Sequence, residues 1–153
     1  MNKWDEEIAI ASPRIMKHEG FRSQPYRDTV GKLTIGYGRN LDDVGISELE
    51  GRVLLEQDLL KAAEQLNKLM QDEVLAKHFD SQENAARSFV LIEMIFNMGV
   101  GTFKKFKNLI AALNDQNWEK AAAEMLDSKW AEQVGQRAKT LAEVMRTNEH
   151  ASA

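Results

Sequence analysis

Two carboxylates in the N-terminal part of the chain stand out because each occupies a special local setting. Glu19 directly precedes Gly20 at the predicted end of a helix, where the partial negative charge of the helix terminus disfavours an ionised carboxylate. Asp28 follows in a glycine-containing stretch with several basic neighbours, which favour the ionised form. A protonated and an ionised carboxyl can act as a general acid and a general base. The pattern therefore predicts acid–base chemistry.

Thr34 lies on a strand predicted just after Asp28, where its hydroxyl is suited to holding a nucleophilic water. Such a set suits hydrolysis of a glycosidic bond, in which one carboxyl protonates the leaving oxygen and the other activates water. Each carboxylate also has a structural interpretation. A glutamate at a helix end is commonly a solvated surface group, and an aspartate beside a glycine turn commonly caps that turn. His18, next to Glu19, is interpreted as a surface or supporting residue.

The composition excludes several other chemistries. The chain has 153 residues and no cysteine, which excludes disulfides, a thiol nucleophile and a cysteine-ligated metal. Its three histidines, His18, His78 and His150, are widely spaced, so we expect neither a metal site nor a cofactor. No apolar stretch approaches the roughly 20 residues that cross a bilayer, and the N-terminus does not resemble a secretory signal. We therefore expect a soluble, cytoplasmically made protein, and the absence of a basic recognition helix argues against nucleic-acid binding.

Charge is unevenly distributed along the chain. The net charge is -4, yet residues 14–39 carry six basic and two acidic side chains, and residues 40–80 carry four basic and ten acidic ones. Lys104, Lys105 and Lys107 form a second basic cluster. The net charge therefore bounds solubility and long-range steering, and does not define what the site can hold.

The N-terminal half predicts a small mixed lobe followed by a long helix. Ser12-Pro13 is typical of a helix start and Gly20 of a helix end, and residues 4–10 predict a separate short helix before it. Residues 29–36 predict an antiparallel hairpin that turns at Gly31. Ser47 and Glu50 have the spacing of a capping box, which begins an apolar stripe that continues to residue 74.

The C-terminal half predicts a helical lobe. Residues 89–98 are apolar almost all round, which predicts a buried central helix that Gly99 ends. Shorter helices are predicted over 108–113, 118–126 and 136–145. The fold class is thus α+β, mostly α. We expect one domain with an α+β lobe (14–46), a connecting helix (47–78) and a helical lobe (80–146) on which residues 1–13 pack.

The order of these motifs resembles a known family. Within residues 18–41 the chain reads Glu19-Gly20, then Tyr26-Arg27-Asp28-Thr29-Val30-Gly31, then Thr34-Ile35-Gly36-Tyr37-Gly38. This resembles the signature of the phage-type lysozymes, the endolysin and muramidase family that includes the T-even phage lysozyme. Further similar segments are Phe96-Asn97-Met98-Gly99, Trp118-Glu119-Lys120-Ala121-Ala122, Ser128-Lys129-Trp130 and Gly135-Gln136-Arg137-Ala138-Lys139.

The resemblance implies a muramidase that cuts the β-1,4 bond between N-acetylmuramic acid and N-acetylglucosamine in peptidoglycan. It implies that Glu19 is the general acid and that Asp28 with Thr34 positions a water for inverting attack. Phe96 and Gly38 are expected to contact substrate, and Arg137 to pair with Glu19. The family also implies a monomeric endolysin that stays in the bacterial cytoplasm until a separate pore, a holin, lets it reach the wall.

Several departures and alternatives remain open. Arg39 replaces a histidine of the T-even enzyme, so the ion pair of that enzyme is expected to be absent, and Glu124 replaces an asparagine that contacts glycan. The stretch between the hairpin and the central helix is also shorter in this chain than in the T-even enzyme. The domain could also come from a tail-associated lysozyme or a toxin. A lytic transglycosylase needs a single acid, so the presence of Asp28 and Thr34 argues against it. A catalytically silent wall-binding or structural protein is the third alternative.

Overall fold

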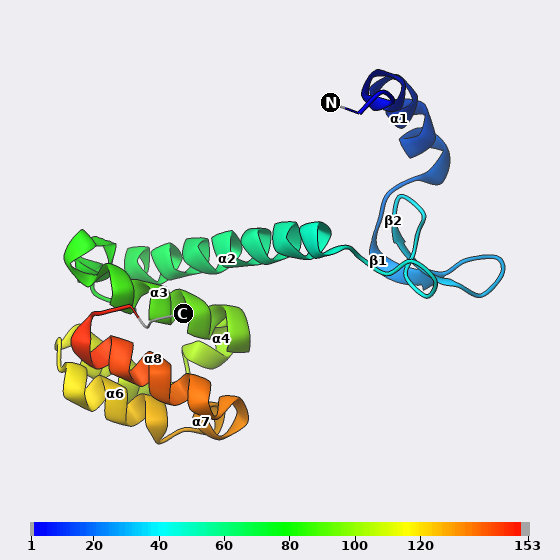
Figure 1. The fold of residues 1–153 in the computed structure, drawn as a ribbon. Coiled ribbons are helices and arrows are strands. Elements are labelled where there is room, and N and C mark those ends of the chain that lie inside the picture. The colour runs from blue at the N-terminus through cyan, green and yellow to red at the C-terminus, as the bar shows by residue number, and fades with distance from the viewer. Residues whose placement is uncertain (1, 151–153) are drawn as a thin grey trace. The chain divides into compact units, whose positions relative to one another are not determined.

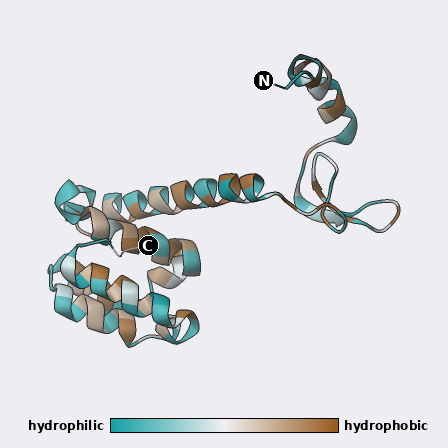
Figure 2. Cartoon of the chain, in the orientation of Figure 1, coloured by the Kyte–Doolittle hydropathy of each residue, from teal (hydrophilic) through white to brown (hydrophobic). Residues whose placement is uncertain are grey.

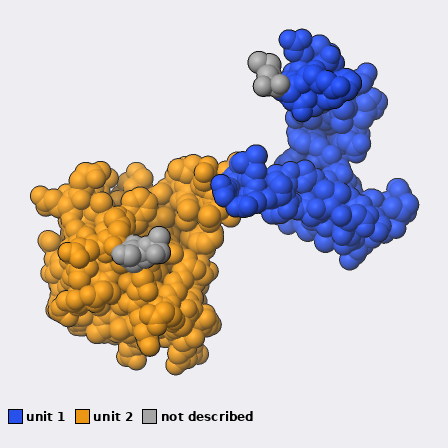
Figure 3. Space-filling model, in the orientation of Figure 1, with its two compact units in different colours: residues 1–53 blue, residues 54–153 orange. Residues whose placement is uncertain are grey.

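The computed structural model describes residues 2–150, and the chain divides into two compact units, residues 1–53 and 54–153 (Figures 1 and 3). Unit 1 begins with helix α1 (Asp5–Glu19). A three-stranded antiparallel sheet follows, in the order β1 (Arg22–Arg27), β2 (Leu33–Gly36) and β3 (Arg39–Asn40). The prediction of an antiparallel hairpin is confirmed, but its first strand is β1, which lies before the predicted range 29–36, and residues 28–32 form the loop that contains Gly31. The short strand β3 is added to this hairpin. The predicted α+β, mostly helical fold class is confirmed as well.

Helix α1 is a single helix, so the prediction of two helices divided at Ser12-Pro13 is wrong. Pro13 lies inside the helix, and the Ser12 hydroxyl donates a hydrogen bond to the Ile8 carbonyl (2.6 Å). Proline lacks the N–H that would reach residue 9, but its fixed φ is helical. The residues before it form a better start, because residues 5–7 are all acidic and complement the positive end of the helix. The acidic first turn therefore prevails over the serine–proline signal.

Helix α2 (Glu48–Gln71) begins in unit 1 and continues into unit 2. Its predicted capping box is confirmed, because the Glu50 N–H donates to Ser47 Oγ (3.1 Å) and the Ser47 N–H donates to Glu50 Oε2 (2.8 Å). The helix is shorter than its apolar stripe, because the chain leaves helical geometry at Glu73, whose φ is 59°. The N–H groups of Val74 and Leu75 then donate to the Leu69 carbonyl, so both residues stay close to the helix end.

Unit 2 is helical in the part of the chain that the structure describes. Two short 3-10 helices, η1 (Lys77–Asp80) and η2 (Gln82–Asn84), precede the central helix α3 (Ala85–Met98), which ends at Gly99 (φ 84°). The remaining helices are α4 (Val100–Phe103), α5 (Lys107–Asn114), α6 (Trp118–Leu126), α7 (Lys129–Val134) and α8 (Gln136–Thr147). The helices predicted over 108–113, 118–126 and 136–145 correspond to α5, α6 and α8. No helix within residues 2–150 has the length and apolarity needed to cross a bilayer.

The core of unit 2 forms around α3. Leu91 and Met94 of this helix are fully buried, together with Phe103, Met125 and Met145 from the helices around it. The opposite side of α3 is open, because Phe89 is 59% exposed and Phe96 is 38% exposed. The prediction of a buried central helix is therefore right for one face only.

Candidate active site

Glu19 is the last residue of α1, and its carboxylate lies against the backbone of Gly38. Gly20 ends the helix with a positive φ (68°), so the chain turns into β1 directly after the glutamate. A Cβ atom built on Gly38 would lie 2.9 Å from Glu19 Oε2 and 3.3 Å from Glu19 Cδ. The turn that connects β2 and β3 therefore meets the end of α1 at two of the predicted site residues.

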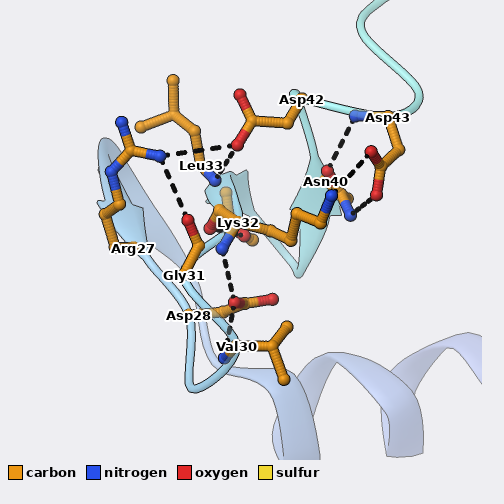
Figure 4. Close-up of polar contacts among 10 residues, drawn as sticks. Arg27, Asp28, Val30, Gly31, Lys32, Leu33, Asn40, Asp42 and Asp43 are labelled. Carbon is orange, nitrogen blue, oxygen red and sulfur yellow. Dashed lines mark hydrogen bonds and ion pairs between the residues drawn. The ribbon is translucent and has the colours of Figure 1, made fainter.

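Asp28 follows β1 and organises the loop that leads to β2 (Figure 4). Its Oδ1 atom accepts hydrogen bonds from the N–H groups of Val30 (3.0 Å) and Lys32 (2.8 Å). The turn-capping interpretation of Asp28 is therefore correct. It does not exclude a chemical role, because capping occupies Oδ1 and the carboxylate has a second oxygen.

Thr34 is almost completely buried in β2, opposite Tyr26 of β1 and Asn40 of β3. Its hydroxyl donates a hydrogen bond to the Lys32 carbonyl (2.9 Å). A hydroxyl that donates keeps lone pairs with which it can accept a hydrogen bond from water. Since the Lys32 N–H binds Asp28 and the Lys32 carbonyl binds Thr34, the backbone of one residue connects the two predicted water-positioning groups.

The segment after β3 folds back onto this loop, and sequence reasoning missed its role. Asp42 Oδ2 accepts from the Leu33 N–H (2.8 Å) and lies 3.5 Å from the Arg27 guanidinium, while Asp43 Oδ1 accepts from Lys32 Nζ (2.9 Å) (Figure 4). The hydrogen bond between Lys32 and Asp43 raises the pKa of the lysine and lowers the pKa of the aspartate. The signal in the sequence is the spacing of Asn40 and Asp43: the Asn40 side chain accepts from the Asp43 N–H three residues on (3.0 Å) and donates to the Asp43 carboxylate (2.9 Å).

Arg39 forms an ion pair with Glu50 of α2. Its guanidinium donates to both carboxylate oxygens of Glu50, with 2.7 Å to Oε2, and also to the Gly45 carbonyl (3.1 Å). The bonds from Arg39 to Glu50, together with that from the Ser47 N–H, lower the pKa of Glu50 to about 2. The sheet is thus tied to the first turn of α2.

Phe96 and Arg137 belong to unit 2, where both line an apolar groove of about 800 Å³. The Arg137 guanidinium pairs with Glu93 of α3, with Nη2 at 2.7 Å and Nε at 3.1 Å from Oε1. The predicted pairing of Arg137 with Glu19 stays a prediction. The other residues that line the groove are Leu55, Glu56, Leu59, Leu60, Ala63, Phe89 and Ile92.

The structure defines a mostly helical α+β protein, with a small antiparallel sheet in unit 1 and a helical unit 2, which is consistent with a lysozyme-like fold. A family model described as phage lysozyme matches residues 16–149. The chain belongs to the phage lysozyme family.

Curated relatives agree with this assignment. A probable T4-type lysozyme from Dictyostelium discoideum is 27% identical over 155 residues, which covers 84% of this chain and 89% of the relative. An endolysin of Bacillus phage B103 is 32% identical over 127 residues, which covers 79% of this chain and 44% of the endolysin. The pre-baseplate central spike protein Gp5 of Enterobacteria phage T4 is 27% identical over 87% of this chain and 27% of its own length. The family is one of lysozyme-type hydrolases, and the substrate class it implies is peptidoglycan.

Proposed function

We propose that this chain hydrolyses the β-1,4 bond between N-acetylmuramic acid and N-acetylglucosamine, with inversion at the anomeric carbon. The observation that carries the proposal is the arrangement around Lys32, whose backbone binds Asp28 at one end and Thr34 at the other. The Asp28 carboxylate and the Thr34 hydroxyl, both hydrogen-bonded to the backbone of Lys32, are the groups that we propose to bind the water molecule. Glu19, in the same unit, supplies the second carboxyl that the reaction needs.

The proposed reaction proceeds in one displacement. Protonated Glu19 donates its proton to the glycosidic oxygen as the bond between that oxygen and the anomeric carbon breaks. A water molecule, held by Thr34 and the second oxygen of Asp28, attacks the anomeric carbon from the opposite face and gives a proton to Asp28. Proton exchange with solvent then restores a protonated Glu19 and an ionised Asp28.

Substrate contacts from the helical unit complete the proposal. Phe96 presents a partly exposed ring in the groove of unit 2, and an exposed aromatic ring is suited to packing on the apolar face of a sugar. Arg137 lines the same groove and is the proposed partner of Glu19, in addition to its pair with Glu93. The cleft is proposed to lie between the predicted lobes, with Phe96 and Gly38 as substrate contacts.

The proposed biological role is that of a monomeric endolysin, which stays in the host cytoplasm until a holin pore gives it access to the wall. The endolysin name of a relative supports this role, whereas the spike protein supports the alternative of a tail-associated lysozyme. Expression of the chain in a Gram-negative host with and without a separate pore protein distinguishes them. Lysis that requires the pore is expected, and light scattering should give the mass of a monomer.

Glu19→Gln is the direct test of the chemistry. It removes the acidic proton while keeping the size of the side chain, so clearing of permeabilised Gram-negative cells should fall by about 100-fold or more. Glu48→Gln is the matched control, because Glu48 is a highly exposed glutamate of the same unit. Full activity of Glu19→Gln would refute the proposed role.

The products identify the reaction type. Hydrolysis gives reducing muramic acid ends, and inversion gives the α-anomer first, which proton NMR detects before mutarotation. Products that end mainly in 1,6-anhydro-muramic acid, seen by mass spectrometry, would establish the alternative of a lytic transglycosylase. Wall binding without any cleavage would establish the catalytically silent alternative.

A further inference from the structure

Two glycines in the segment Thr34-Ile35-Gly36-Tyr37-Gly38 have different surroundings. Both have a positive φ, 67° at Gly36 and 81° at Gly38, so both occupy a conformation that side chains rarely adopt. A Cβ atom on Gly36 would have no neighbour within 4 Å. A Cβ atom on Gly38 would meet Glu19. Backbone conformation therefore explains both glycines, but Gly38 meets a second requirement.

That second requirement concerns the side chain of Glu19. The nearest three atoms to a Cβ on Gly38 are Oε2 at 2.9 Å, Cδ at 3.3 Å and Cγ at 3.7 Å, all from Glu19. Real Cβ atoms essentially never come as close as 2.9 Å to another heavy atom, so the carboxylate would have to move. Because the atoms that must move are the end of a flexible side chain, such a move costs the fold little. Its cost falls on the position of the acid.

We propose that Gly38 is a positioning residue for Glu19, and that its bare α-carbon is the surface against which the acid rests. This role rests on the proposed function of Glu19 and differs from the substrate contact predicted for Gly38. Within residues 2–53 no ion pair holds the Glu19 carboxylate, so inside this unit its contact with the turn limits where it lies, independently of the proposed pair with Arg137. A general acid must lie within hydrogen-bond reach of the leaving oxygen, and a displacement of about 1 Å can cost roughly 100-fold in rate.

The test compares Gly38→Ala with Gly36→Ala. Both variants place alanine at a positive φ, so both should lose thermal stability to a similar extent. Only Gly38→Ala places a methyl group where the carboxylate lies, so its kcat should fall about 10- to 100-fold below that of Gly36→Ala. Loss of the proposed substrate contact of Gly38 would instead raise KM for soluble glycan fragments, so the two parameters separate the two roles. Activity is measured at a temperature at which circular dichroism shows both variants folded.

A second measurement follows the carboxylate itself. The side-chain carboxyl carbon of Glu19, assigned by its loss in Glu19→Gln, should change its chemical shift in Gly38→Ala and keep it in Gly36→Ala. In a Glu19→Ala background the contact is absent, so Gly38→Ala and Gly36→Ala should lower the melting temperature by the same amount. Any difference in melting temperature between the two variants in the wild-type background should therefore disappear.

Several results would overturn the proposal. One is equal kcat for the two variants, and another is an unchanged Glu19 resonance in Gly38→Ala. Failure of Gly38→Ala to fold under conditions in which Gly36→Ala folds would also overturn the proposal. The substitution would then destabilise the backbone of the turn and not only displace the Glu19 carboxylate. If Glu19→Gln is fully active while the Glu19 resonance still moves in Gly38→Ala, the contact stands and the proposed function of Glu19 fails. The two failures are therefore distinguishable.

Discussion

At the scale of the residue, Asp28 combines a structural and a proposed chemical role on different oxygens. Oδ1 accepts from the Val30 and Lys32 N–H groups, and asparagine offers an amide oxygen in the same position. Asp28→Asn should therefore preserve the loop while removing the charge that accepts a proton from water. We expect activity to fall by about 100-fold or more, with a melting temperature close to that of the wild type.

The matched variant is Asp28→Ala, which removes both the charge and the hydrogen-bond acceptor. It should lose activity to a similar extent and also lower the melting temperature, because two N–H groups of the loop lose their acceptor. Turbidity clearing and thermal unfolding, measured on the same preparations, separate the two roles. Wild-type clearing by Asp28→Asn would show that the charge of Asp28 has no part in the reaction.

Single residues also show which part of the site could be predicted. The chain brings Asp28 and Thr34 close together in sequence, and a hairpin is a local structure, so their proximity follows from a local pattern. The contact of Glu19 with Gly38, and those of Asp42 and Asp43 with the hairpin, depend on how separate segments fold back. Contacts between segments are hard to read from a local pattern, which explains why the sequence indicated the hairpin that carries Asp28 and Thr34 but missed the residues that support it.

At the scale of the element, the start of α2 combines a predicted and an unpredicted feature. The capping box of Ser47 and Glu50 is a local motif and was predictable. The pairing of Glu50 with Arg39 joins α2 to the sheet and was not. The start of α1 shows the opposite case, because two local signals competed and the acidic turn at residues 5–7 prevailed over Ser12-Pro13.

The Glu50 network predicts a specific dependence of stability on pH. The hydrogen bonds from Arg39 and Ser47 hold the pKa of Glu50 at about 2 in the folded protein, below the ordinary value of 4.5. The unfolded chain therefore binds this proton at higher pH than the folded chain does. The stabilisation is fully present above pH 4.5 and is lost as the pH falls towards 2.

Glu50→Gln removes this titration, so its stability should fall less steeply than that of the wild type between pH 4.5 and pH 2. Urea unfolding followed by circular dichroism across this range measures the difference. Glu48→Gln is the control, since Glu48 lies in the same helical turn and is far more exposed. A wild-type slope in Glu50→Gln would contradict the assigned network.

At the scale of the whole molecule, charge pairing within unit 1 changes the interpretation of the charge pattern. By sequence, the basic excess lies in residues 14–39 and the acidic excess in residues 40–80. In the structure, Arg27, Lys32 and Arg39 pair with acidic residues from the second segment. Residues 1–53 carry eight basic and nine acidic side chains, so the net charge of this unit is close to zero. We expect long-range attraction to an anionic wall to be weak, so local contacts must supply most of the binding.

The predicted packing of residues 1–13 on the helical lobe also concerns the whole molecule. Helix α1 has hydrophobic and hydrophilic residues along its length and buries none of them (Figure 2). Trp4, Ile8, Ala11 and Ile15 recur at helical spacing and line one shallow apolar face. In unit 2, the groove beside Phe89 leaves apolar side chains open as well. Covering one apolar face with another lowers the free energy, because both surfaces leave water.

Ile8→Asp and Ile10→Asp test this prediction with the same substitution on two sides of one helix. Ile8 lies on the apolar face, whereas Ile10 lies off it and is 80% exposed. If the face of Ile8 packs on the helical lobe, Ile8→Asp should lower the free energy of unfolding by roughly 2 kcal/mol, the value of burying one large aliphatic side chain. Ile10→Asp should change it by less than about 0.5 kcal/mol, as surface substitutions usually do.

Urea unfolding of the full chain gives both values. NMR shifts at Phe89 and Ile92 that move only in Ile8→Asp would identify the covering surface as the groove. Equal effects of the two substitutions would instead mean that α1 remains solvated on both sides.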